Sequence, residues 1–262
     1  MKQKTIYVFL DECILVDKLV ENFQKKNLEE KFLNNSQRSY IESFKSLKNF
    51  CNILEKSMYK IPVKFISFES ALEGALKKIK EKEYRKYLDS KKIENFHKYL
   101  QRRKAKYLEQ KEYVIKIDGI PINIIREKYE KKYQEIFDRK YRNLSEILSQ
   151  SVDKDDTDYI KTILIYSQEK NGRGIYIFLT NDERIIKNFS TIFNEHVRNK
   201  IYILDQEGLN RFSEKMEKLP NNEKKLDDYI NEILKILSYG YISKSINKNK
   251  NKRKRKTSRL CQ

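Results

Sequence analysis

Four short apolar runs, each followed by a stretch with helical spacing, constrain the fold more than any other feature of the sequence. They are rich in β-branched and aromatic residues, which is typical of buried strands, and they lie at 5–10, 63–66, 175–179 and 201–204. Strands that alternate with helices predict a mostly parallel sheet with helices on both faces. We therefore expect an α/β fold, a three-layer α/β/α sandwich. Helical patterns cover 40–58, 69–79, 156–169, 206–217 and 223–238.

The middle of the chain has a different character. Lys-, Glu-, Arg- and Tyr-rich helical patterns flank two apolar runs, 113–117 and 120–124, with Asp118-Gly119 between them. This dipeptide is typical of a two-residue hairpin turn. We predict a basic helical and hairpin segment inserted into the sandwich, and a disordered basic tail without apolar periodicity. The predicted division is a sandwich domain at 1–80 and 143–240, an insertion at 81–142 and a tail at 241–262.

The positive charge is concentrated in two places. The chain has a net charge of +19, with 57 Lys and Arg against 38 Asp and Glu. Residues 77–142 carry 22 basic and 11 acidic residues, and 243–262 carry nine basic residues and no acid, so the rest is close to neutral. A neutral body with two basic segments predicts a polyanionic partner. RNA is the partner we expect, with DNA as the alternative, and no membrane.

Cysteine and histidine exclude several classes of chemistry. Their positions are scattered: Cys13, Cys51, Cys261, His97 and His196. No pair has the spacing of zinc ligands or of a disulfide framework, and no Ser/His or Cys/His pair is indicated. No apolar run approaches the ~18 residues that cross a bilayer. We expect a cytoplasmic protein, or a nuclear one in a eukaryote, given the basic tail.

Carboxylates are the remaining candidates for chemistry. Asp11 ends the first strand, Asp182 follows the third strand, and Asp156 and Asp158 begin the helix before that strand. Glu73 lies on the helix after the second strand. Functional groups of parallel α/β sheets collect at the carboxyl ends of the strands. Carboxylates gathered there repel one another unless a cation neutralises them, and hard oxygen ligands suit Mg²⁺ or Mn²⁺.

The order of these acids resembles that of the PIN-domain nucleases and of the related NYN nucleases. The stretches that carry the resemblance cover about half of the chain, and the last two are the most specific: Tyr7–Asp11, Ile66–Gly74, Asp155–Ile160 and Ile177–Asp182. The resemblance implies a metal-dependent endoribonuclease that cleaves single-stranded RNA. Its site would hold Mg²⁺ or Mn²⁺ with Asp11, Glu73, Asp156, Asp158 and Asp182.

Two positions in this assignment stay open, and the chain departs from the family pattern. Glu69 is the alternative to Glu73, and Asp155 is a third candidate beside Asp156 and Asp158. The insertion has no counterpart in compact members of the family. Bulky Ile163, Leu164 and Ile165 stand on a helix where the family has small residues.

Three other functions compete with this interpretation. The first is an RNA- or DNA-binding protein on the same fold without activity. The second is a phosphatase of the haloacid dehalogenase class, which needs an acid two residues after Asp11, where this chain has Cys13. The third is a structural interaction protein, in which each Asp simply caps a helix. Cleavage that depends on a divalent metal separates the nuclease from the first of these, and failure of the acids to converge would favour the third.

Overall fold

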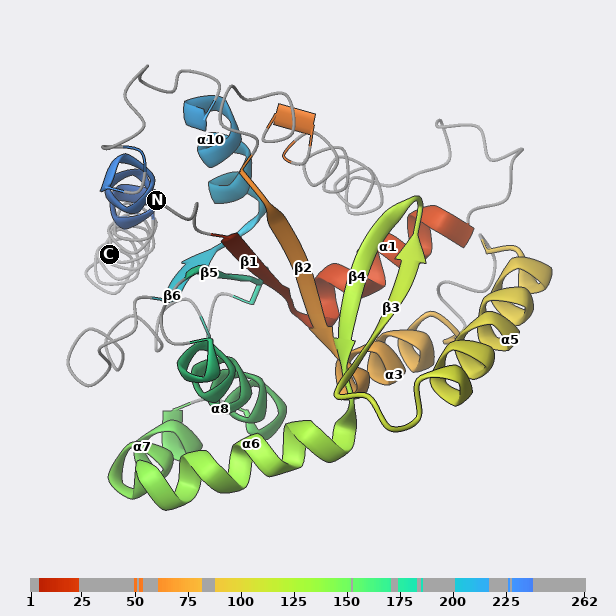
Figure 1. Cartoon of the computed structure of the whole chain (residues 1–262). Coiled ribbons are helices and arrows are strands. Elements are labelled where there is room, and N and C mark those ends of the chain that lie inside the picture. Colours follow the sequence, from red (N-terminus) through yellow and green to blue (C-terminus); the bar gives the residue numbers. More distant parts are fainter. Residues whose placement is uncertain are drawn as a thin grey trace, which may run out of the picture.

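The computed structural model describes residues 5–23, 50, 52–53, 61–81, 88–151, 153–170, 174–182, 185, 201–216, 226 and 228–237. Its centre is a six-stranded sheet with the strand order β3-β4-β2-β1-β5-β6 (Figure 1). All neighbouring strands are parallel except β3 and β4. The α/β class and the mostly parallel sheet are therefore confirmed. The strands are β1 (Thr5–Leu10), β2 (Val63–Phe68), β3 (Glu112–Ile117), β4 (Ile120–Ile125), β5 (Gly174–Leu179) and β6 (Ile201–Leu204).

Helices cover the sheet on both faces (Figure 1). The chain leaves β1 toward β2 through one set of helices and returns from β4 to β5 through another. Because these two crossovers run in opposite directions along the sheet, right-handed connections place them on opposite faces. The first side carries α1 (Glu12–Phe23), α3 (Glu69–Lys78) and α5 (Ser90–Lys106). The second carries α6 (Glu127–Lys140), α7 (Arg142–Ser151) and α8 (Lys154–Glu169), and α10 (Gln206–Met216) follows β6.

The segment expected as an insertion, 81–142, contributes two strands to this same sheet. β4 pairs in parallel with β2, with Phe68 opposite Ile125, and β3 forms the edge. The hairpin prediction is confirmed: Asp118 and Gly119 have φ values of 50° and 82°. Positive φ at both central residues is the requirement of a type I′ turn, which explains why the dipeptide is Asp-Gly.

Helix α8 is buried on nearly every side. Thr157 and residues 159–167 are all buried, which accounts for the bulky Ile163, Leu164 and Ile165. Its aromatic side chains pack on the sheet in a fixed order. The ring of Tyr159 stacks on Phe68 at the end of β2, with 4.8 Å between centroids, and Tyr166 meets Phe9 edge-on at 5.5 Å. This order sets the first turn of α8 at the carboxyl edge of the sheet.

Helices α3 and α6 cap each other where they leave the sheet. The Glu130 carboxylate accepts hydrogen bonds from the backbone N–H groups of Glu69 and Ser70, at 2.7 and 3.2 Å. The Glu69 carboxylate in turn accepts one from the N–H of Glu127 at 3.0 Å. The first N–H groups of a helix have no partner within it, so an acid there satisfies them and the positive end of the helix dipole. These two acids fix the starts of both helices beside each other.

Two of the predicted segments fall outside this description. Most of the helix expected at 40–58 and all of the tail expected at 241–262 lie outside the described residues. Among the helices that are described, none combines the length and the apolar character needed to cross a membrane.

Candidate functional site

Asp11 is the buried acid at the centre of the carboxyl edge. It follows β1 directly and is only 4% exposed. Its Oδ2 accepts hydrogen bonds from the Thr180 hydroxyl at 2.6 Å and from the Cys13 thiol at 3.1 Å. Its Oδ1 accepts one from the N–H of Glu12 at 2.7 Å. Thr180 follows β5, so the ends of two adjacent parallel strands are joined through this carboxylate.

Burial dominates the electrostatics of Asp11 and Cys13. Desolvation raises the pKa of Asp11, although the hydrogen bonds from Thr180, Cys13 and Glu12 act to lower it. Burial raises the pKa of the Cys13 thiol well above its usual value, and the negative charge of Asp11 adds to that increase. Cys13 is therefore a protonated donor to Asp11.

The turn after β5 continues the same network. The Thr180 hydroxyl, which donates to Asp11, accepts a hydrogen bond from the N–H of Asp182 at 3.0 Å. The N–H of Asn181 donates to the Cys13 sulfur at 3.4 Å. Asp182 is half-buried and Asn181 is exposed. The Thr-Asn-Asp stretch is thus held against Asp11 by its backbone, and Asp182 lies at the same edge.

The Tyr159 hydroxyl marks where the first turn of α8 meets this edge. Burial raises its pKa, and the negative charges of Glu12, Asp11 and Asp155 raise it further, while a hydrogen bond with Ser70 lowers it. These three acids are therefore neighbours of one phenol. Asp155 and Asp11 thus both influence the phenol of Tyr159.

Asp158 has charged neighbours of both signs. Burial raises its pKa, the charges of Lys161 and Lys154 oppose that rise, and the charges of Asp155 and Asp138 add to it. The ammonium group of Lys161 lies 2.7 Å from an oxygen of Asp138 on α6. Asp156 is half-buried in the first turn of α8.

Glu73 and Glu69 both contact Lys104, which is on α5. The Lys104 ammonium lies 2.6 Å from Glu73 and 3.0 Å from Glu69. Glu73 is 56% exposed, whereas Glu69 is 10% exposed and also accepts a hydrogen bond from the Tyr113 hydroxyl at 3.2 Å. Hydrogen bonds from Glu127, Lys104 and Tyr113 outweigh burial and lower the pKa of Glu69. Glu69 therefore serves the capping and ion-pair network.

Glu12 is the acid of this edge that the sequence analysis missed. Its Oε1 lies 2.9 Å from the ammonium group of Lys78. Gly74 makes room for it, because a Cβ built on Gly74 would lie 2.6 Å from the Glu12 carboxylate. A hydrogen bond with Glu12 raises the pKa of Lys78, and the charge of Asp11 adds to this effect. The signal in the sequence was a lone glycine inside a helix, four residues before a lysine.

The donor set at this edge suits a hard cation. Carboxylate and hydroxyl oxygens are the ligands that Mg²⁺ and Mn²⁺ take, and Asp11 Oδ1 carries one hydrogen bond, against two at Oδ2. Within the described part of the chain, however, no three His, Cys, Asp or Glu side chains are grouped so that they could hold a metal ion. A bound cation would draw its ligands closer together or use water for the remaining positions.

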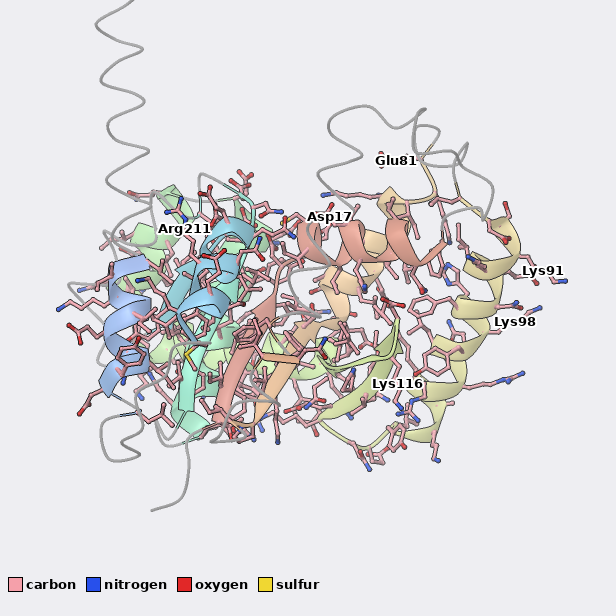
Figure 2. All side chains as sticks on the ribbon, turned by 90° about the horizontal axis from the view of Figure 1, so that it is seen from above. Asp17, Glu81, Lys91, Lys98, Lys116 and Arg211 are labelled. Atoms are coloured by element: carbon pink, nitrogen blue, oxygen red, sulfur yellow. The ribbon has the colours of Figure 1, made fainter. Side chains whose placement is uncertain are left out.

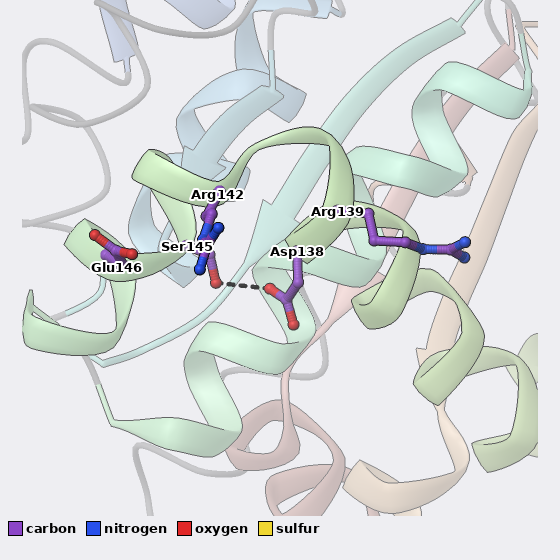
Figure 3. Close-up of a pocket in the computed structure, with 5 residues that line it drawn as sticks. All are labelled: Asp138, Arg139, Arg142, Ser145 and Glu146. Carbon is purple, nitrogen blue, oxygen red and sulfur yellow. Dashed lines mark hydrogen bonds between the residues drawn. The ribbon is translucent and has the colours of Figure 1, made fainter.

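A second charged area is an open hollow at the junction of α6 and α7 (Figure 3). The residues that line it are Asp138, Arg139, Arg142, Ser145 and Glu146. The Ser145 hydroxyl donates to Asp138 at 2.6 Å, and Arg139 extends away from the other four side chains. Its acids and bases balance, so nothing in the hollow selects a ligand of one charge.

Comparison of the chain with protein-family models gives no match, and no curated protein or solved structure matches it either. The contacts at the carboxyl edge are therefore the basis for assigning a function.

Proposed function

We propose that the chain is a metal-dependent nuclease with a PIN-like three-layer fold that cleaves RNA at the carboxyl edge of its sheet. The observation that carries the proposal is the hydrogen bond from Thr180 to Asp11. It joins the ends of β1 and β5, and it sets the Thr-Asn-Asp182 turn beside Asp11. The same edge receives the start of α8, where Asp155 and Asp11 both act on Tyr159.

Each residue has a definite task in this proposal. Asp11 would hold Mg²⁺ or Mn²⁺ through Oδ1, while Thr180 and Cys13 fix the carboxylate through Oδ2. Asp182 and the acids at the start of α8 would complete the shell, directly or through water. When bound, such an ion activates water and neutralises charge on the phosphate. Glu73 and Asp158 are assigned to the metal by resemblance alone, because their contacts are with Lys104 and with the Lys161 side of α8.

RNA as the substrate rests on charge. The net charge of +19 favours a polyanion, and contacts with phosphates do not depend on base sequence. The alternative is a protein that binds RNA or DNA on this fold without cutting it. The net charge of +19 supports this alternative equally, because binding to phosphates needs no metal site.

The experiment compares two Asp→Asn substitutions at opposite edges of the sheet. Asp11→Asn removes the central charge with little change in shape. Asp118→Asn is the matched control, because Asn also suits the type I′ turn before Gly119 and its amide oxygen can still accept a hydrogen bond from buried Lys18, which lies 3.2 Å from Asp118. Full-length protein would be incubated with end-labelled single-stranded RNA and Mn²⁺ or Mg²⁺, with EDTA as the blank.

We expect metal-dependent cleavage by the parent and by Asp118→Asn, and loss of at least about 100-fold in Asp11→Asn. Thermal unfolding would show that both variants are folded. Equal cleavage by Asp11→Asn and the parent would overturn the assignment of the site. Tight RNA binding by the parent without cleavage under any divalent metal would favour the alternative.

A further inference from the structure

Helix α5 is far more basic than α6, the other helix described within the segment 81–142. Its 17 residues contain seven Lys and Arg and one acid, Glu94. Helix α6, with 14 residues, contains five Lys and Arg and four acids. The charge surplus of the middle of the chain is therefore concentrated on α5, and the question is which of its cations are available to a partner.

The structure divides these cations into an inner and an outer set. Arg103 Nε donates to the carbonyl oxygen of Val114 at 2.7 Å, and Lys104 is held by Glu69 and Glu73. These inner cations are part of the fold. The outer cations are exposed on the side opposite buried Phe96 and Leu100, and we call them the α5 ridge: Lys91, Lys98, Arg102 and Lys106.

The α5 ridge is a row of positive charge that turns gradually around the helix. Its residues are separated by seven, four and four positions, so they fall on one side of a helix with 3.6 residues per turn. The last three are about 6 Å apart along the axis, at a rise of about 1.5 Å per residue. Figure 2 shows Lys91 and Lys98 extending outward from α5, away from the sheet. Lys98 is paired with exposed Glu94, a contact that costs little to break.

The ridge is rigid, and the end of α5 that carries Lys106 is fixed at the carboxyl edge of the sheet. The Arg126 guanidinium donates from Nη2 to the carbonyl oxygens of Lys104 and Tyr107, at 2.6 and 2.8 Å, and so caps the end of α5. Arg126 directly follows β4. The registers place Phe68 opposite Ile125 and Phe9 opposite Ile66, so the end of β4 is two strands from that of β1. Two strand spacings are about 10 Å.

We infer that the α5 ridge binds the phosphate backbone of a single RNA strand and leads that strand to the carboxyl edge beside Asp11. The inference rests on the proposed function for the identity of the polyanion. A row of exposed cations on a rigid helix holds phosphates in line without reading bases, so the binding is independent of sequence. The partner is a nucleic-acid strand, since a row about one side chain wide does not make the broad basic surface that an anionic membrane needs.

The test neutralises equal numbers of exposed cations on two helices. The ridge variant carries Lys91→Gln, Lys98→Gln, Arg102→Gln and Lys106→Gln. The control variant carries Lys128→Gln, Lys131→Gln, Lys132→Gln and Arg139→Gln, which are exposed on α6. Both lose four charges and keep good helix formers. Both also carry Asp11→Asn and are studied without metal, so binding is measured apart from cleavage.

The probe is a fluorescent oligouridylate, titrated at several salt concentrations. We expect the ridge variant to bind at least about tenfold more weakly at low salt. The slope of log K against log salt should fall by up to about 3, since each phosphate contact on a single strand contributes about 0.7. The control variant should lose much less affinity, and its slope of log K against log salt should fall much less. Equal losses in the two variants, or none in the ridge variant, would overturn the inference while leaving the cleavage result untouched.

Discussion

The Thr180 hydroxyl donates a 2.6 Å hydrogen bond to Asp11, a residue 169 positions earlier in the chain. Both residues are buried, so Thr180→Val keeps the shape of the side chain and leaves Asp11 Oδ2 with one donor fewer. Hydrogen bonds to charged groups contribute about 1.5–3 kcal/mol, and we expect a loss of that order in the free energy of unfolding at neutral pH. Thr180→Ser should lose much less.

Urea unfolding of both variants checks this prediction, with the cleavage assay alongside. If the hydrogen bond also orients Asp11 for metal, Thr180→Val should cut more slowly than Thr180→Ser at saturating Mn²⁺. A valine variant as stable as the parent would show that the hydrogen bond does not join the strand ends.

Glu12 and Glu73 are the two candidates for the second acid of the site, and they differ in their surroundings. Glu12 shares the surroundings of Tyr159 with Asp11, whereas Glu73 is exposed and paired with Lys104. We expect Glu12→Gln to raise the Mn²⁺ concentration needed for half-maximal cleavage by about tenfold or more. Glu73→Gln should change that concentration little. A Mn²⁺ titration of each variant decides between them. The reverse ranking would restore Glu73 to the place that the family resemblance gives it.

Gly74 should report on the position of Glu12 without any assay of activity. Alanine is favoured over glycine in a helix by about 1 kcal/mol, yet a Cβ here meets the Glu12 carboxylate at 2.6 Å. Gly74→Ala alone should therefore gain little stability. In a Glu12→Ala background the same change should stabilise the protein by about 1 kcal/mol. Thermal unfolding of the four proteins completes the cycle, and equal effects in the two backgrounds would contradict the contact.

Two buried acids should make the protein less stable as the pH rises toward neutrality. Burial raises the pKa of Asp17 to about 7 and that of Glu130 to about 7, against ordinary values of 3.8 and 4.5. Between about pH 4 and 7 the folded state therefore binds more protons than the unfolded state. In that window the free energy of unfolding falls as pH rises, and the loss is complete above the folded pKa.

The measurement is urea unfolding of the parent, Asp17→Asn and Asp118→Asn from pH 5 to pH 8. Asp17→Asn cannot ionise, so its stability should depend less on pH, and it should be more stable than the parent at pH 8. Asp118→Asn serves as the control for loss of a partly exposed carboxylate, one that is paired with Lys18. Parallel pH curves for Asp17→Asn and the parent would show that Asp17 does not titrate in this range.

The strands were predictable because their signals are local. Each of the runs at 5–10, 175–179 and 201–204 contains its own β-branched and aromatic residues, and Asp118-Gly119 specifies its turn without help from the rest of the chain. The pairing of β4 with β2 was not predictable, since periodicity does not say which strands are neighbours. That pairing makes the hairpin part of the central sheet.

The site was predictable only where strand ends set it. Asp11 and Thr180 end adjacent parallel strands, so their meeting follows from topology. The Glu73 side chain is paired with Lys104, which lies 31 residues later in the sequence. No pattern within α3 predicts this pairing. Glu12 was overlooked because a carboxylate in the first turn of a helix is common for reasons of dipole alone.

The exchange of caps between Glu69 and Glu130 has a consequence for shortening the protein. A chain cut back to remove 81–142 would lose α5, β3, β4 and α6. It would also take Glu130 away from the two N–H groups at the start of α3 and Lys104 away from Glu69. The start of α3 carries Ser70, which contacts Tyr159 beside Asp11. Removal of 81–142 would thus disturb the surroundings of Asp11. A minimal version of this protein has to keep α6 or supply a new acid in place of Glu130.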